Sequence, residues 1–374
     1  MNLAWKDIRR QGVRFLLTGV GLGLLFTIVL AMGGIYRGMV VEATVLTDAM
    51  RADLWVVQRD TRGPFAERSV VPRGLDDRLR VVDGVADAES FTFATIQRGD
   101  VAHPMRIGVV GLAWPGNHGQ SLPLVAGRAL TQAHRELVVD DSLGLPLGAT
   151  LPLGDDTYTV VGLTHGFVAS GGDPLAFATE RDAAAILGWL APESRRMDPR
   201  AGAEAPPSAV LVRLLPGEDP AAVQARLAAW PDVTVWTADE QHGLLLQGVI
   251  DKARKQIGLF RVLLTAVSAI IVALILYNMT VAKSHEIALV KLLGGRTRVV
   301  VGMILQQALL LGAIGYGVAV TLASVAFDHF PRRVIVTAED FAGLALLIAT
   351  ITILASIAGI ARALRIPPTL ILAG

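Results

Sequence analysis

The stretch VLLTAVSAIIVALILYNMTVA, residues 262–282, runs directly into KSHEIALVKLLGG, residues 283–295. The first stretch carries no charge, and because about 20 apolar residues suffice to cross a bilayer, it predicts a membrane-spanning helix. A second uncharged run follows at residues 299–327. The connector at residues 283–298 is therefore held at one face of the membrane.

The connector has the pattern of a short helix. Its apolar residues fall at helical spacing, with Ile287, Val290 and Leu293 in line and Ala288 and Leu292 beside them. Ser284 is a candidate N-cap, and Gly294 with Gly295 provides a stop. A segment this apolar at a membrane surface must bury its face in lipid headgroups or in another protein. Two interpretations stay open, a tight interfacial turn and a docking helix for a soluble partner.

Composition places the chain among membrane proteins that carry a sizeable polar domain. Of its 374 residues, 52% are hydrophobic and only 18% are charged. The net charge of +1 gives no sign of nucleic-acid binding. Cysteine is absent, which excludes disulfides and thiolate chemistry.

The N-terminal part predicts a membrane anchor. Residues 1–14 form a basic, amphipathic segment, and residues 15–36 form an uncharged apolar run. A signal peptide is the alternative, but its apolar core is roughly 7–15 residues long and this run is longer. We therefore expect an uncleaved first span at residues 15–36.

A fourth span is expected at residues 341–361, before a tail at residues 362–374. Gly19 and Gly23 form a small-xxx-small pair that favours close helix packing. Asn278 is the main polar residue of the second span and a further candidate for helix packing. The spans are nearly free of ionisable residues, which disfavours an ion or proton relay.

Residues 37–237 differ from the spans and predict an α+β domain of two subdomains. Short strand-like runs alternate with amphipathic helices, and a β-rich block at residues 136–163 interrupts the α+β pattern. Strands are expected at residues 53–57, 89–97, 105–112, 209–215 and 233–237, and helices at 75–82, 182–190 and 220–230. Residues 191–207 predict a mobile loop. Residues 238–257 predict a helical stalk that leads into the second span, at residues 258–282.

Basic residues predict the orientation. Lys and Arg are enriched before the first span, in the 283–298 connector and in the tail, whereas the 328–340 loop has more acids than bases. The positive-inside rule then places both termini and the connector in the cytoplasm and the large domain outside. Lys252, Arg254, Lys255 and Arg261 conflict with this assignment, and a stalk would lift most of them off the bilayer.

No enzyme signature is present in the sequence. There is no phosphate-binding G-x-x-x-x-G-K-[ST] loop, and His285-Glu286 lacks the second histidine of H-E-x-x-H because Leu289 stands there. Asp140–Asp141 and Asp155–Asp156 are interpreted as turn and cap residues. We predict no catalytic residue, no metal ligand and no nucleic-acid partner, and hence a membrane scaffold with an external domain and an internal docking helix.

Four stretches resemble one family. LAWKDIRRQGVRFLLTGVGLGL (3–24) is similar to its basic amphipathic entry into the first span. SHEIALVKLLGGRTRVVVGMILQQALLLGAIG (284–315) is similar to its R-E-I-A-L-L-R-A-L-G-A segment, with Glu286, Ile287, Ala288, Leu289 and Gly294 in register. His285 and Gly295 replace the usual Arg and Ala. ELVVDDSLGLPLGATLPLGDDTYTVVGL (136–163) resembles its periplasmic core domain, and IPPTLILAG (366–374) its closing P-x-x-A-L-R-G, with Ala373 for Arg. The family is that of FtsX/MacB-type (type VII) ABC transporter permeases, and the size is closest to DevC-like permeases without a fused ATPase.

The resemblance implies four transmembrane helices in the bacterial inner membrane, with a MacB-like periplasmic domain inserted between the first and second. It implies a homodimer, a separate ATPase dimer that carries ATP and magnesium, no cofactor on this chain, and contact with membrane lipids, a membrane-fusion protein and an outer-membrane channel. The ATPase would dock on Ser284, His285, Glu286, Ile287, Ala288, Leu289, Val290, Lys291, Leu292, Leu293 and Gly294. ATP hydrolysis would then drive a periplasmic movement that exports or extracts a substrate.

The alternative is an FtsX-like regulatory scaffold that activates a periplasmic cell-wall hydrolase and transports nothing. The large β-rich block favours the transporter.

Overall fold

The computed structural model describes residues 12–98, 105–116, 122–169, 171–190, 205–293, 297–330 and 333–365. It contains two compact units, Met1–Gly38 with Ala253–Gly374, and Met39–Lys252. The predicted N-terminal segment up to residue 11, most of the predicted loop at 191–207, Gly294 and the tail from residue 366 lie outside the described residues.

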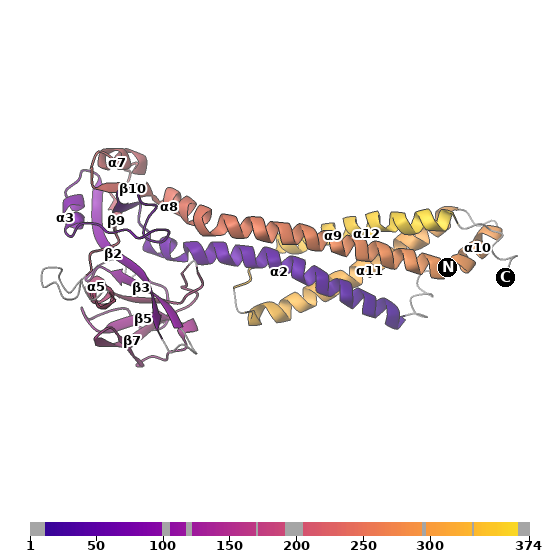
Figure 1. The fold of residues 1–374 in the computed structure, drawn as a ribbon, viewed down its shortest axis with the longest axis horizontal. Helices are drawn as coiled ribbons and strands as arrows, with labels where there is room; N and C mark the ends of the chain where they lie inside the picture. The colour runs from indigo at the N-terminus through magenta and orange to yellow at the C-terminus, as the bar shows by residue number, and fades with distance from the viewer. Residues whose placement is uncertain are drawn as a thin grey trace. The chain divides into compact units, whose positions relative to one another are not determined.

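Four long helices carry the apolar runs, namely α2 (Gly12–Met50), α9 (Asp251–Ala282), α11 (Thr297–Ala326) and α12 (Ala338–Leu364) (Figure 1). Within the described residues each is long and apolar enough to cross a membrane. The first helix does not stop near residue 36 but continues to Met50. The fall in hydropathy after residue 36 indicates the edge of the bilayer. The backbone stays helical beyond it because Leu46 and Met50 pack in the core of the second unit.

The spans pack closely through small residues. A Cβ added to Gly19 would collide with Ile314 of α11, and one added to Gly23 would stand 2.5 Å from Val318. The missing side chains therefore let α2 and α11 approach each other, as small-xxx-small pairs do in membranes.

A short segment, residues 333–337, joins the first span to the last. The N–H of Ile335 donates to the carbonyl oxygen of Gly34 on α2 at 3.1 Å. Arg37, one turn further along α2, forms an ion pair with Asp340 in the first turn of α12. We call this set of contacts the clasp, and it fixes α2 at residues 34–37, inside that helix, to the start of α12.

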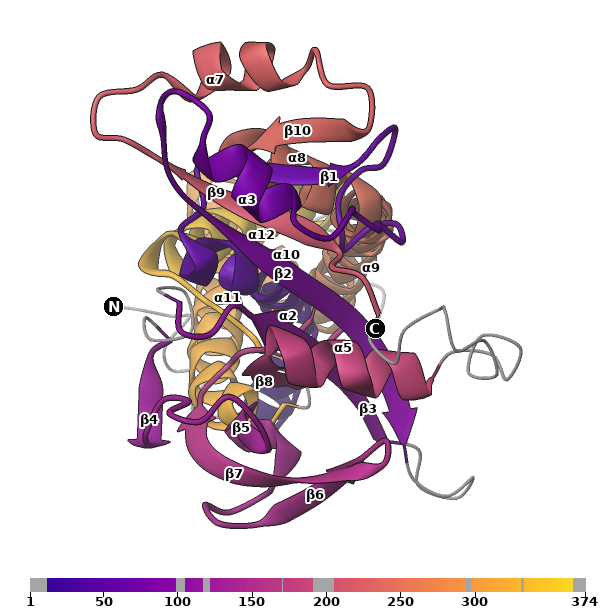
Figure 2. The same cartoon turned by 90° about the vertical axis from the view of Figure 1, so that its left-hand side faces the viewer.

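The second unit contains a mixed β-sheet (Figure 2). Its strands are β1 (Leu54–Gln58), β2 (Val85–Arg98), β3 (Met105–Leu112), β4 (Leu124–Gly127), β5 (Glu136–Asp140), β6 (Thr150–Leu153), β7 (Asp156–Thr164), β8 (Leu175–Thr179), β9 (Ala209–Leu214) and β10 (Val233–Thr237). Among the described residues these form one ten-stranded sheet in the order β10-β1-β9-β2-β3-β8-β5-β7-β4, with β6 paired to β7. Only β3–β8 and β5–β7 are parallel. The helices are α3 (Leu75–Arg80), α5 (Glu180–Trp189), α7 (Pro220–Leu227) and α8 (Ala238–Leu245).

Both faces of the sheet are covered at β1. In β1, Leu54 and Val56 face a core shared with α3 and α7, while Trp55 and Val57 face a second core that includes the end of α2. Alternate residues thus enter different cores, so the strand is a continuous apolar run rather than an alternating one.

The sequence predicts two subdomains, whereas the residues form one sheet whose two ends have separate cores. The β-rich block is inserted between β2 and β9, as expected. The sequence did not predict β4 and β8. LAFAT in β8 is rich in alanine and LVAG in β4 is short, so neither has a strong strand pattern.

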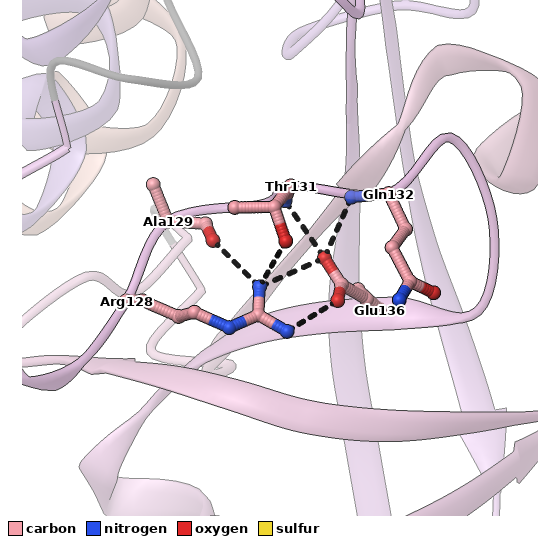
Figure 3. Close-up of polar contacts among 5 residues, drawn as sticks. All are labelled: Arg128, Ala129, Thr131, Gln132 and Glu136. Atoms are coloured by element: carbon pink, nitrogen blue, oxygen red, sulfur yellow. Dashed lines mark hydrogen bonds and ion pairs between the residues drawn. The ribbon is translucent and has the colours of Figure 1, made fainter.

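The loop between β4 and β5 is fixed by a buried carboxylate (Figure 3). Glu136 receives hydrogen bonds from both terminal nitrogens of Arg128, and the backbone N–H groups of Thr131 and Gln132 donate to its Oε2 at 2.8 and 3.0 Å. Burial acts to raise the pKa of Glu136, but these donors outweigh it and lower the pKa to about 2. This carboxylate clamp orders the loop.

The predicted stalk is helical. Thr237 and Glu240 form a capping box at the start of α8, and a single π-turn, Leu246–Ile250, connects α8 to α9. Asp140 caps the 3-10 turn Asp141–Leu143, as predicted for a cap residue.

Candidate functional site

The connector between the second and third spans forms a separate helix, α10 (Ser284–Leu292). Lys283 breaks α9 with φ −101° and ψ 13°, and its carbonyl oxygen accepts from the N–H of Ile287 at 2.9 Å. The predicted N-cap is wrong. Ser284 is the first helical residue, and the N-cap position belongs to Lys283, whose side chain makes no capping bond.

The inner face of α10 packs on the spans of the same unit. Ile287 and Ala288 are fully buried against Val300 and Ile304 of α11 and Ala363 of α12. This contact holds α10 at the ends of two spans and leaves its opposite side uncovered.

Lys291 ties α10 to α12 by a polar contact. Its Nζ donates to the carbonyl oxygens of Ala363 at 2.8 Å and Leu364 at 3.2 Å, in the last turn of α12. The last four carbonyl groups of an α-helix have no donor four residues further on, and a cation is favourable at a helix C-terminus. Lys291 therefore both caps α12 and fixes the rotation of α10.

The outer face of α10 is an exposed apolar stripe. Leu289 is 47% exposed, Leu292 48% and Leu293 81%. His285 and Glu286 are exposed on the same side. Residues separated by three or four positions share one face of a helix, and so His285 and Glu286 lie beside these leucines. We call these five residues the outer face.

The predicted apolar face of the connector therefore differs from the observed one. Val290 is half-buried beside Ile287, but Leu292 and Leu293 point away from the spans. Nearly every side of this helix carries an aliphatic residue, so spacing alone cannot tell which of them the chain buries for itself.

The electrostatics at the start of α10 are set mainly by burial. Burial lowers the pKa of Lys283, and Glu286 partly opposes that effect. Over the described ranges, no group of three or more His, Asp or Glu residues could hold a metal ion. The exposed leucines of α10 can present an apolar surface to a partner.

The structure separates the three predicted packing residues. Gly19 and Gly23 contact α11, whereas Asn278 is exposed on α9. Sequence reasoning missed Lys291 as an α12 cap and Arg37 as a partner of Asp340. Two signals were available in the sequence. Lys291 stands one turn before the glycines that end the helix, and Arg37 and Asp340 are unlike charges at the ends of two spans.

Two family models match most of the chain. The model of the MacB-like periplasmic core domain matches residues 15–230, and that of the FtsX-like permease C-terminal domain matches residues 249–368. An ABC transporter permease of Mycobacterium tuberculosis is 26% identical over 375 residues and covers 99% of both chains. A protein of Staphylococcus epidermidis named as a hemin transport system permease is 31% identical over 84 residues, 22% of this chain and 24% of its own.

Among solved structures, the periplasmic region of MacB from Actinobacillus actinomycetemcomitans matches with a TM-score of 0.35 and 12% identity, over 51% of this chain and 92% of that one. The extracellular domain of the ABC-type transporter YknZ matches with a TM-score of 0.31 and 14% identity, over 50% of this chain and 99% of that one.

Proposed function

This chain belongs to the FtsX/MacB family of ABC transporter permeases, and we propose that it converts ATP hydrolysis by a separate cytoplasmic ATPase into movement of its periplasmic domain. That movement exports or extracts a substrate. Both termini and α10 are cytoplasmic in this proposal, and the sheet lies on the periplasmic side of the inner membrane. ATP and magnesium are held by the ATPase.

The outer face of α10 carries the proposal. Three leucines stand exposed on a helix whose other side is fixed to two spans, as a surface awaiting a partner would be. Fully burying a leucine contributes about 1.5–3 kcal/mol, so the half-exposed Leu289 and Leu292 and the more exposed Leu293 offer several kcal/mol to docking.

Rigid connections support transmission from that surface. A displacement of α10 would be transmitted to α12 through the hydrogen bond of Lys291, and to α11 through the packing of Ile287. The second span, α9, continues without a loop through the π-turn into α8. Single π-turns inside helices occur at functional positions, and this one is a candidate hinge for the stalk.

We also propose that two copies pair through α9. Only 17% of its most apolar stretch is buried within the chain, the lowest of the four spans in the described residues. Asn278 is exposed near the C-terminal end of α9, and an amide without a hydrogen-bond partner is costly in lipid. The same residue of a second copy would supply the partner, as polar residues do between membrane helices.

A matched pair of variants tests ATPase docking. Leu292 on α10 and Leu215 after β9 are each 48% exposed. We expect Leu292→Arg to lose the ATPase that co-purifies with tagged permease in mild detergent, and Leu215→Arg to keep it. Equal recovery of the ATPase from both folded variants would refute docking on α10.

The same preparation tests the partners outside the cytoplasm. Recovery of a membrane-fusion protein supports export with an adaptor. Recovery of a cell-wall hydrolase instead would replace transport with regulation as the function.

A further inference from the structure

Three cations near the start of α9 have no partner in the described part of the chain. Arg254, Lys255 and Arg261 are exposed and form no ion pair or side-chain hydrogen bond with any described residue. In residues 251–262 the only acid is Asp251. Basic residues are normally depleted on the non-cytoplasmic side of a span, so their position calls for an anion.

Their depth on the helix matches the headgroup layer. Counting about 20 residues back from Ala282 places the hydrocarbon boundary near Leu263, so Arg261 lies at that boundary. Arg254 lies two turns further out, roughly 10 Å along the axis. The headgroup region on each side of a bilayer is about 5–8 Å thick, and the two arginines therefore bracket it.

The face of α9 that carries Arg254 and Arg261 is also accessible to a lipid. Arg254 and Arg261 lie in line with Ser268 and Val272, which are buried against the other spans, but the arginines stand beyond the point where that burial ends. Val262, which follows Arg261 at the hydrocarbon boundary, is 69% exposed and offers an apolar contact for an acyl chain. Asn278 points about 100° away, so pairing of two copies through the Asn278 side leaves the arginines uncovered.

We propose that Arg254, Lys255 and Arg261 form a binding site for the headgroup of an anionic phospholipid in the leaflet on the side of the large domain. Arginine binds phosphate oxygens bidentately, and lysine adds a point charge. Each cation near an anionic surface contributes about fivefold to binding, so three contribute on the order of 100-fold. The naming of the leaflet as periplasmic, and the argument that basic residues are unusual on that side, rest on the proposed function.

The test measures lipid retention directly. Full-length permease is reconstituted in nanodiscs of phosphatidylcholine with a minor fraction of phosphatidylglycerol, and native mass spectrometry counts the lipids retained after release. We expect wild type to retain phosphatidylglycerol preferentially and the preference to fall as sodium chloride is raised. The triple variant R254A/K255A/R261A should lose it, whereas R254K/R261K should keep most of it.

A second triple variant is the control. R59A/R62A/R68A removes three exposed cations from the sheet domain and should retain phosphatidylglycerol like wild type. Undiminished retention by R254A/K255A/R261A, or a wild-type preference insensitive to salt, overturns the proposal. Displacement of the lipid by millimolar inorganic phosphate also overturns it, because the site would then bind free phosphate. No ATPase is present in this assay, so its failure leaves docking on α10 untouched.

Discussion

Replacing Glu136 by glutamine should loosen the β4–β5 loop at neutral pH and have little effect in acid. Holding the pKa at about 2 rather than 4.5 corresponds to about 3 kcal/mol of stabilisation when the group is charged in both states. Arg128 is 48% exposed, and solvent screening reduces this figure to about 1–2 kcal/mol. Glu136→Gln removes the charge and with it most of that stabilisation.

The sign of the pH dependence follows from the lowered pKa. The unfolded chain binds a proton near pH 4.5 and the folded chain only near pH 2. The stabilisation is therefore complete above pH 4.5 and is lost as the pH falls towards 2. Wild type and variant should differ at pH 7 and converge near pH 2.

Hydrogen–deuterium exchange of the intact protein in detergent measures the effect where it arises. The amides of Thr131 and Gln132 donate to Glu136, and a loss of 1–2 kcal/mol speeds their exchange by about 5- to 30-fold. Glu218→Gln is the matched control, because its pair with Arg226 is exposed on both sides and should contribute little. Equal protection in wild type and Glu136→Gln at pH 7, or a difference that persists unchanged near pH 2, would refute the reasoning.

Three further variants test packing in the membrane unit, each by thermal unfolding in detergent. Gly23→Ala should lower stability by about 1–3 kcal/mol because its Cβ meets α11, whereas Gly21→Ala, with open space around it, should not, and equal melting temperatures would contradict the packing. Lys291→Met should cost about 1–2 kcal/mol through the uncapped end of α12, and faster amide exchange there is the local sign. Ile287→Ala should lower the free energy of unfolding by about 2–4 kcal/mol because it leaves a cavity, whereas Leu289→Ala should hardly change it. The opposite order would mean that α10 has been assigned the wrong inner face.

The elements with a strong local pattern could be predicted from the sequence. The four spans follow from uncharged length, and the strands at residues 105–112 and 233–237 have the observed bounds. Strands whose residues have a weak strand pattern could not be predicted from the sequence. The strand β8 is buried on both faces by neighbours that are distant in sequence, and its two alanines hide it.

The candidate site could be predicted only in part. Spacing located α10 and its leucines, but which leucines face outwards depends on where α11 and α12 lie, and that is tertiary information. The clasp is harder still, since the partners Arg37 and Asp340 are 303 residues apart. Neither residue has a local pattern that names the other.

The clasp also sets an order of events during biosynthesis. Translation at about 5–20 residues per second puts roughly 15–60 s between the appearance of Arg37 and that of Asp340. Throughout that interval the newly inserted first helix carries an unneutralised arginine at the membrane boundary. A product truncated before residue 340 would lack this ion pair permanently, and its first helix would have no such contact with a last one.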